Sequence, residues 1–451
     1  MIRLVLLVAL CFLVELSIGF SCSFSCRRHR QEDHPLVVAL ATTTSELDHT
    51  SSSSPVQNHK DLTNLLLRIS YDGSRFTGWS AANQSDDDHT DDKLLSKGKN
   101  SKGKGFVRPV EQIIRTNIAK LYSNVNPKRI IIEGCSRTDK GVHARQMMAQ
   151  VYCLTESAFQ ALQENPDASS VATSSNELYL SIPGKRTPHP ISPFDASYFQ
   201  PIPMGGNMSR MAFALNRMLP DDVRITGIAP CPIIPATTTT TDNNNAPFHA
   251  TVSTISKTYE YRISIGELFD PTTRRFVWHL DGGVAKSKNF DLELVQSACA
   301  IVSGTHNFAA FEGAPKSPQE RRERAEKWKD PTTTTCHLMD VSILLVEDSS
   351  RSSTFPASLQ GVESATQEFH FRITGDRFLY KMNRFLVGAL VAIGCGKLSL
   401  QDLERALETG SWVDPITGKR PQFQCAPAKG LTLAEVSYGD ETIIDWQPLR
   451  Y

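Results

Sequence analysis

The 451-residue sequence lacks several features that define common protein classes. It has ten cysteines, but no Cys-x-x-Cys pair and no Cys/His cluster with the spacing of a zinc site. It has no glycine-rich phosphate-binding loop, and its apolar run at residues 4–14 is too short to cross a membrane. These absences argue against a metal site or a nucleotide cofactor, and we expect neither.

The chain also lacks a net charge. Lys plus Arg and Asp plus Glu each total 48, which gives +0 at pH 7, whereas nucleic-acid-binding proteins often carry a basic excess. Any RNA binding would therefore require a local basic patch. The length allows about two or three domains, and 40% hydrophobic residues supply a sizeable core.

The most informative segment that is present runs from Gly134 to Ala144. Apolar runs at residues 130–132 and 147–153 flank it, which predicts a strand, a tight loop and a returning strand. Loops on a rigid sheet often carry reacting groups. Asp139 can serve there as a nucleophile or a base, with Arg137 close enough to influence its ionisation. The alternative is an Asx-turn capped by a surface ion pair. The neighbouring Cys135 has no evident base beside it, so we do not expect a thiol nucleophile.

This loop resembles the catalytic loop of the tRNA pseudouridine synthase A (TruA) family, whose core reads Arg-Thr-Asp-x-Gly-Val-His. The matching residues are Arg137, Thr138, Asp139, Gly141, Val142 and His143. Four further segments match family motifs in the same order: Tyr71–Trp79, Phe248–Ala250 with Lys257–Arg262, Phe378–Gly388, and Ala426–Leu431. The resemblance covers roughly residues 62–440, with insertions.

The resemblance implies an isomerase that converts specific uridines of tRNA to pseudouridine through an aspartate carboxylate, without cofactor or metal. It also implies a homodimer in which one tRNA contacts both subunits. Two other classes remain open: a non-catalytic RNA-binding protein on the same scaffold, and a secreted hydrolase that uses Asp139.

The family's catalytic residues correspond to Asp139, Arg384 and Tyr259. A carboxylate in a pocket would be neutralised by burial, and a guanidinium opposite reverses that effect. We therefore expect Arg384 to face Asp139, although it could also be a surface arginine with a buried stem. Tyr259 would stack on an extruded uracil or assist proton removal at C5, with core packing as the alternative.

The expected substrate-binding residues are Arg137, Tyr259, Lys140 and His143. By resemblance Arg137 binds a phosphate or holds the flipped nucleotide. Lys140, like Asp72, could instead position the loop. His143 could equally satisfy the loop by hydrogen bonding.

The order of elements predicts an α+β protein of two halves, each with a mostly antiparallel sheet and helices on one face. The resemblance implies the pseudouridine synthase fold, in which two similar α/β halves meet at a central RNA-binding cleft. We place the halves at residues 61–205 and 206–445. Insertions are expected at about 80–105, 156–200, 232–246, 312–335 and 347–365. Helical spacing predicts helices at 110–121, 208–218, 292–302, 319–329 and 379–393.

Residues 1–60 read as a leader and a polar linker. The apolar run at residues 4–14 followed by Ser17–Gly19 has the form of a secretory signal peptide. Residues 21–30 are rich in Ser, Cys and Arg without an acidic residue, which is typical of transit peptides. We expect import into an algal complex plastid, with the mitochondrion or the secretory pathway as alternatives.

Overall fold

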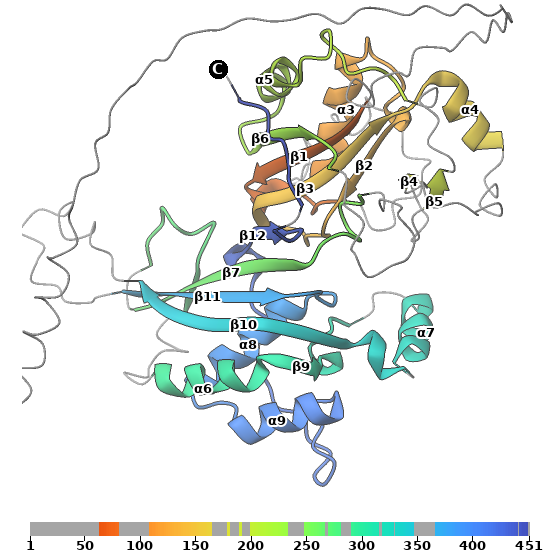
Figure 1. Ribbon diagram of the computed structural model, residues 1–451. Coiled ribbons are helices and arrows are strands. Elements are labelled where there is room, and N and C mark those ends of the chain that lie inside the picture. Colours follow the sequence, from red (N-terminus) through yellow and green to blue (C-terminus); the bar gives the residue numbers. More distant parts are fainter. Residues whose placement is uncertain are drawn as a thin grey trace, which may run out of the picture. The chain divides into compact units, whose positions relative to one another are not determined.

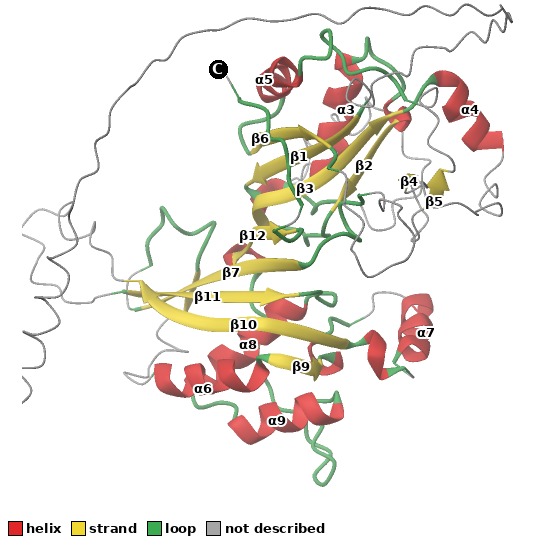
Figure 2. Cartoon of the chain, viewed as in Figure 1, coloured by secondary structure: helices red, strands yellow, loops and turns green. Residues whose placement is uncertain are grey.

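The structure is a computed structural model that describes residues 63–80, 108–164, 178–180, 189–191, 199–232, 248–266, 269–280, 290–314, 318–328, 330–346, 366–440 and 442–449. Its centre is a sheet of ten strands in which β6-β1-β3-β12-β7-β11-β10-β9 are successive neighbours, β2 pairs with β3, and β8 pairs with β7 (Figures 1 and 2). Most neighbours are antiparallel. The predicted α+β class with a mostly antiparallel sheet is confirmed.

The N-terminal half contains β1 (Asn64–Tyr71), β2 (Ile130–Gly134), β3 (His143–Cys153) and β6 (Val223–Pro230), with α3 (Val110–Leu121) and α5 (Met208–Met218) packed together. Pro109 precedes α3, a position where its missing N–H is tolerated. Although the sequence placed the end of this half near residue 205, α5 contacts β6, and β6 pairs along its length with β1. These two elements therefore pack with the N-terminal half.

The C-terminal half contains the remaining strands of the large sheet: β7 (Ser256–Ile265), β8 (Trp278–Leu280), β9 (Gly304–Asn307), β10 (Thr335–Val346) and β11 (Gln367–Gly375). Helix α6 (Leu292–Val302) packs on β10 and on the helices α8 (Met382–Gly394) and α9 (Leu400–Thr409). β10 buries Leu338 and Ile343 and exposes Met339 and Leu344. One face of this strand is therefore covered and the other is open.

Strand β12 (Leu431–Ser437) joins the two halves into one sheet. It pairs in parallel with β3, at Thr432 with His143, and antiparallel with β7, at Leu433 with Tyr259. Arg145 of β3 also forms an ion pair with Glu260 of β7 across it. Most of the buried hydrophobic residues of both halves belong to one cluster.

The predicted helices lie close to the observed ones, and the largest difference in a starting position is at α8. The sequence predicted a helix from residue 379, but α8 begins at Met382, because Lys381 has a left-handed backbone with φ of 60°. Helix α7 (Pro318–Lys327) and the short helix η9 (Pro331–Thr333) lie in the insertion predicted at 312–335. Among the described residues, no helix is both long and apolar enough to span a membrane.

The other predicted insertions are described only in part. Helix α4 (Glu156–Glu164) and the two-stranded sheet of β4 (Leu178–Leu180) and β5 (His189–Ile191) belong to the one predicted at 156–200. The leader and the bulk of the insertions predicted at 80–105, 232–246 and 347–365 lie outside the described residues.

Candidate active site

The Asp139 loop, residues 135–142, connects β2 to β3 through a tight turn. The Val142 N–H donates to the Asp139 carbonyl at 3.1 Å, and Gly141 has φ of +82°. Glycine reaches this left-handed conformation without the steric penalty of a Cβ atom. Because β2 and β3 are paired and largely buried, the loop begins and ends on fixed backbone.

The turn that follows β1 supports the Asp139 loop through close backbone contacts. A Cβ atom at Gly73 would lie 1.9 Å from the Val142 carbonyl oxygen, and one at Gly78, where φ is +119°, would lie 2.6 Å from the Thr138 carbonyl oxygen. The Trp79 N–H donates to that same Thr138 oxygen at 3.1 Å. Because Gly73 and Gly78 have no Cβ atom, the turn after β1 can pack directly against the backbone of the Asp139 loop.

His143 is buried and links three segments. The Gly73 N–H donates to its Nδ1 at 3.1 Å, and its Nε2 lies 2.9 Å from the Arg275 carbonyl and 3.1 Å from the Lys429 carbonyl. With both ring nitrogens engaged and the side chain only 3% exposed, His143 holds the loop in place. These bonds fit the loop-supporting role that the sequence left open for His143, and its contact with substrate stays a prediction.

Asp72 completes the support of the loop. Its Oδ1 accepts from the Ser74 N–H at 3.0 Å and lies 3.2 Å from His143 Nδ1, while its Oδ2 pairs with Arg275 at 2.6 Å. Burial alone would raise the pKa of Asp72, but the nearby His143 ring and the Ser74 hydrogen bonds outweigh it, so the pKa lies well below its ordinary value. The carboxylate is therefore ionised over the whole neutral range.

Arg384 reaches Asp139 from the first turn of α8. Its Nη1 lies 3.6 Å from Asp139 Oδ2, and both side chains are mostly buried, with exposed fractions of 16% and 23%. Its Nε donates to the Ala426 carbonyl at 2.7 Å, and the Ala426 N–H donates to the Arg384 carbonyl at 3.0 Å. The expected proximity of this arginine and this aspartate is observed, and the segment before β12 fixes the guanidinium.

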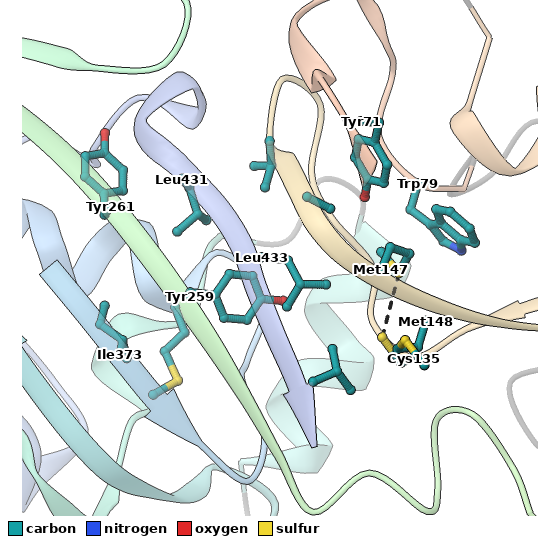
Figure 3. Packing of buried hydrophobic residues seen from close by; sticks show 14 of the residues in the cluster. Tyr71, Trp79, Cys135, Met147, Met148, Tyr259, Tyr261, Ile373, Leu431 and Leu433 are labelled. Atoms are coloured by element: carbon teal, nitrogen blue, oxygen red, sulfur yellow. Dashed lines mark hydrogen bonds between the residues drawn. The ribbon is translucent and has the colours of Figure 1, made fainter. Parts of the chain in front are cut away.

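Tyr259 projects from β7 beside Leu433 of β12, as Figure 3 shows. Its hydroxyl is 2.8 Å from Ser136 Oγ, and the Phe378 ring meets it edge-on at 5.1 Å between centroids. Burial raises the pKa of Tyr259, with smaller contributions from neighbours such as Asp139. The phenol is therefore neutral near pH 7. Tyr259 is only 5% exposed and belongs to the hydrophobic core cluster, and its role toward the uracil base stays a prediction.

Tyr261, two residues further along β7, is a core residue. It is fully buried, and its hydroxyl donates to the Pro427 carbonyl at 2.6 Å.

The Cys135 thiol is buried against β3. Its Sγ donates to the sulfur of Met147 at 3.7 Å, and burial raises the pKa of the thiol to about 11 (Figure 3). A thiol with these properties is not a nucleophile near neutral pH. The structure thus agrees with the expectation that Cys135 is not catalytic.

Arg137 and Lys140 lie on the outer side of the loop, where both are exposed. The Arg137 charge also acts on Glu111 of α3, whose pKa is raised chiefly by burial. Contact of Arg137 and Lys140 with the substrate remains a prediction.

The Phe248–Ala250 motif anchors the end of β2. His249 Nε2 lies 2.8 Å from Glu133, and both side chains are buried. The Ala250 N–H donates to the Gln150 side chain at 3.1 Å, and the Thr251 hydroxyl donates to the Gly134 carbonyl at 3.0 Å. This motif therefore fixes the strand that delivers the Asp139 loop.

Some contributors to the site were not expected from the sequence. The Ala426, Pro427 and Lys429 carbonyls act through the backbone, which a side-chain pattern does not reveal. Ser136 and Phe378 lie within recognised motifs, but their contacts with Tyr259 depend on how β7 meets the other half.

Comparisons with known proteins find tRNA pseudouridine synthases. The model of a family described as tRNA pseudouridine synthase matches residues 298–439. The chain is 24% identical to tRNA pseudouridine synthase A of Methylacidiphilum infernorum over 372 residues, which cover 82% of this chain and 94% of the relative. It is also 24% identical to the protein of that name from Acetivibrio thermocellus over 375 residues, 83% of this chain and 99% of the relative.

The mixed α+β fold with its mostly antiparallel sheet is consistent with the pseudouridine synthase fold. The chain is thus similar, along most of its length, to the tRNA pseudouridine synthase A (TruA) family.

Proposed function

We propose that this chain is a tRNA pseudouridine synthase, an isomerase that converts specific uridines in tRNA to pseudouridine. The observation that carries the proposal is the ion pair between Asp139 of the β2–β3 loop and Arg384 of α8, with Tyr259 beside the same loop. The relatives that match along most of this chain carry the name of that activity.

The reaction needs little chemical equipment. The C1′–N1 bond of uridine breaks, the base turns, and a C1′–C5 bond forms; C5 loses its hydrogen and N1 gains one. No group enters or leaves, and nothing is oxidised. Asp139 either attacks C1′ or removes a proton from the sugar, and both routes use the same ionised carboxylate.

Arg384 would keep that carboxylate ionised. In a mostly buried site the charged form is disfavoured by desolvation, and an arginine 3.6 Å away compensates for it. The hydrogen bond to the Ala426 carbonyl holds the guanidinium in this orientation, so the pair is formed before substrate binds.

Tyr259 would stack on the extruded uracil, an interaction worth about 1–3 kcal/mol per base. Its hydroxyl is bonded to Ser136, which fixes the ring in position. Arg137 and Lys140, both exposed on the loop, would contact the RNA backbone.

The test is to incubate the protein, from about residue 60, with unmodified tRNA labelled in uridine, beside Asp139→Asn. The product nucleosides are then separated chromatographically. Pseudouridine from the wild type alone supports both the reaction and the role of Asp139. Binding of tRNA without product from either protein would instead favour a non-catalytic RNA-binding protein.

We also propose that the protein acts as a homodimer, as the family resemblance implies. Met339, Leu344 and Leu345 of β10 expose apolar side chains, which a second copy could cover. Sedimentation equilibrium should give twice the mass of one chain. A monomer at micromolar concentration would contradict this proposal.

For the compartment we propose import into an algal complex plastid. The support is the signal-like run at residues 4–14 followed by the transit-like residues 21–30. A fluorescent protein fused after residue 60 should accumulate in the plastid. Fluorescence confined to the secretory pathway or to mitochondria would contradict it.

A further inference from the structure

The turn that precedes α8, residues 378–381, forms a lip beside the candidate active site. Phe378 points inward and meets the Tyr259 ring edge-on at 5.1 Å. Two residues later Tyr380 points outward and is 36% exposed. The lip therefore presents one aromatic ring to the site and one to the surface next to it.

Lys381 has an unusual backbone conformation at the end of this lip. Its φ of 60° and ψ of 8° lie in the left-handed region, which costs a residue other than glycine about 1–2 kcal/mol. The Arg384 and Phe385 N–H groups both donate to its carbonyl, so the turn starts the helix that carries Arg384. A strained residue that persists beside a functional group points to a role in function.

The insertion at α7 braces the lip from outside. The Gly313 N–H donates to the Tyr380 carbonyl at 2.7 Å, and a Cβ atom at Gly313 would lie 2.9 Å from the Tyr380 ring. Arg324 of α7 donates to the Gly313 carbonyl at 2.8 Å and lies over the Trp328 ring. The outward position of Tyr380 is thus fixed by packing.

Lys381 stands three residues before Arg384, whose N–H donates to the Lys381 carbonyl at 3.0 Å. Burial raises the pKa of the Cys425 thiol, and the charges of Arg384, Lys381 and Asp139 each act on it as well. Within the described part of the chain, no carboxylate pairs with Lys381, and its Nζ lies 5.1 Å from the centre of the Tyr380 ring. Arg384 is already engaged by Asp139 and the Ala426 carbonyl. On this side of the site, Lys381 is therefore available to an anion.

We propose that the lip is a site for the nucleotide next to the target uridine: Lys381 binds its phosphate and Tyr380 stacks on its base. This inference rests on the proposed function. A nucleotide carries a phosphate and an aromatic base on one sugar, so a cation beside an exposed ring matches both. Lysine neutralises a backbone phosphate and releases its counterions, and aromatic side chains stack on unpaired bases of any sequence. Exposed Arg137 and Lys140 contribute cations from the other half.

The test compares Lys381→Asn with the wild type in the full chain. Asparagine tolerates the left-handed backbone, so the substitution removes the charge and keeps the turn. The affinity for unmodified tRNA is measured from 50 to 200 mM salt, and kcat and KM are measured in parallel. We expect the slope of log K against log[salt] to shrink by about 0.7–0.9, the value of one phosphate contact. KM should rise more than kcat falls, and Lys381→Arg should restore both the slope and KM.

Lys397→Asn is the matched control, since Lys397 is an exposed lysine just beyond the opposite end of α8. It should leave the salt slope and KM unchanged. Tyr380→Ala should raise KM by about 5- to 150-fold, the loss expected for one stacked base, while Tyr380→Phe should retain stacking.

An unchanged salt slope and KM in Lys381→Asn, with pseudouridine still formed by the wild type, would overturn the lip site and leave the proposed function intact. Equal losses in Lys381→Asn and Lys397→Asn would also overturn it, because the effect would then be one of general charge. Failure of the wild type to form pseudouridine would instead count against the proposed function.

Discussion

Asp139 and Arg384 reach the same site with two different kinds of support. Asp139 lies on a loop whose backbone is held by Gly73, Gly78 and His143. Arg384 lies in the first turn of the 13-residue helix α8, most of which is buried, and one carbonyl fixes its guanidinium. The carboxylate therefore depends on many long-range backbone contacts, whereas the arginine depends on one helix and on two hydrogen bonds with Ala426.

The largest effect should come from Gly78→Ala, which disturbs the support of the Asp139 loop. The Cβ atom would strain a backbone with φ of +119° and meet the Thr138 carbonyl at 2.6 Å. We expect a loss of about 2–4 kcal/mol in the free energy of unfolding, from backbone strain together with overpacking, and a large loss of activity. Urea unfolding and single-turnover kinetics measure the two.

Gly418→Ala is the control for that experiment. Gly418 has φ of +65°, but among the described residues no atom outside its chain neighbours lies within 4 Å of a Cβ placed there. It should lose only about 1 kcal/mol, the cost of the left-handed backbone, and keep its activity. Equal effects of the two substitutions would mean that the close approach to Thr138 is unimportant.

Asp72→Asn should also weaken the support of the Asp139 loop. Its effect on the free energy of unfolding should be smaller than that of Gly78→Ala and should depend on pH. The ion pair with Arg275 is lost, for which we expect about 1–2 kcal/mol at pH 7. Because the pKa of Asp72 is lowered in the folded protein, its stabilisation is fully present above the unfolded pKa, about 3.9, and is lost as pH falls towards the folded value.

The difference in unfolding free energy between wild type and Asp72→Asn should therefore shrink below about pH 4. Asp221→Asn, at a fully exposed carboxylate, is the control and should show almost no difference at pH 7. A difference between wild type and Asp72→Asn that stays constant from pH 7 to pH 3 would contradict the assignment.

Tyr259→Phe tests the contact between β7 and the Asp139 loop. It removes the hydrogen bond to Ser136 but keeps the ring. Because burial keeps the phenol neutral, we expect a decrease in kcat far smaller than the roughly 100-fold cost of losing a general base. Tyr259→Ala should be much worse, since stacking is lost. A hundredfold decrease in Tyr259→Phe would show that the hydroxyl takes part in proton transfer.

Cys135→Ala should have the smallest effect on catalysis. The thiol is buried with a pKa of about 11, so removing it should leave kcat unchanged and lower only the stability. Cys299→Ala, at another buried thiol within α6, should behave alike. Loss of turnover in Cys135→Ala but not in Cys299→Ala would mean that the Cys135 thiol takes part in catalysis.

The helices and the β2–β3 hairpin were the parts of the fold that the sequence predicted most readily. Periodic apolar residues located α3, α5 and α6, and the two runs that flank Gly134–Ala144 located β2 and β3. These features are local, so spacing is enough to predict them. The start of α8 was placed three residues too early, because a left-handed lysine gives no signal in the hydrophobic pattern.

The assembly of the site was less accessible. The motifs named Asp139, Arg384 and Tyr259, but their roles stay predictions. The pattern could not show that β12 pairs with both β3 and β7, which brings the halves into one sheet. It also left His143 open between loop support and substrate binding, and gave no sign of its bonds to the Arg275 and Lys429 carbonyls. Contacts between residues far apart in sequence carry no local period.

The central claim is that the Arg384 guanidinium, from the C-terminal half, keeps the Asp139 carboxylate of the N-terminal half ionised. Single-turnover pseudouridine formation by Arg384→Lys, beside Arg372→Lys as an exposed control, tests it most directly. Lysine cannot bind Asp139 and the Ala426 carbonyl in the same fixed geometry, so we expect about a hundredfold loss in Arg384→Lys and none in the control. Turnover near the wild-type rate in Arg384→Lys would contradict the account.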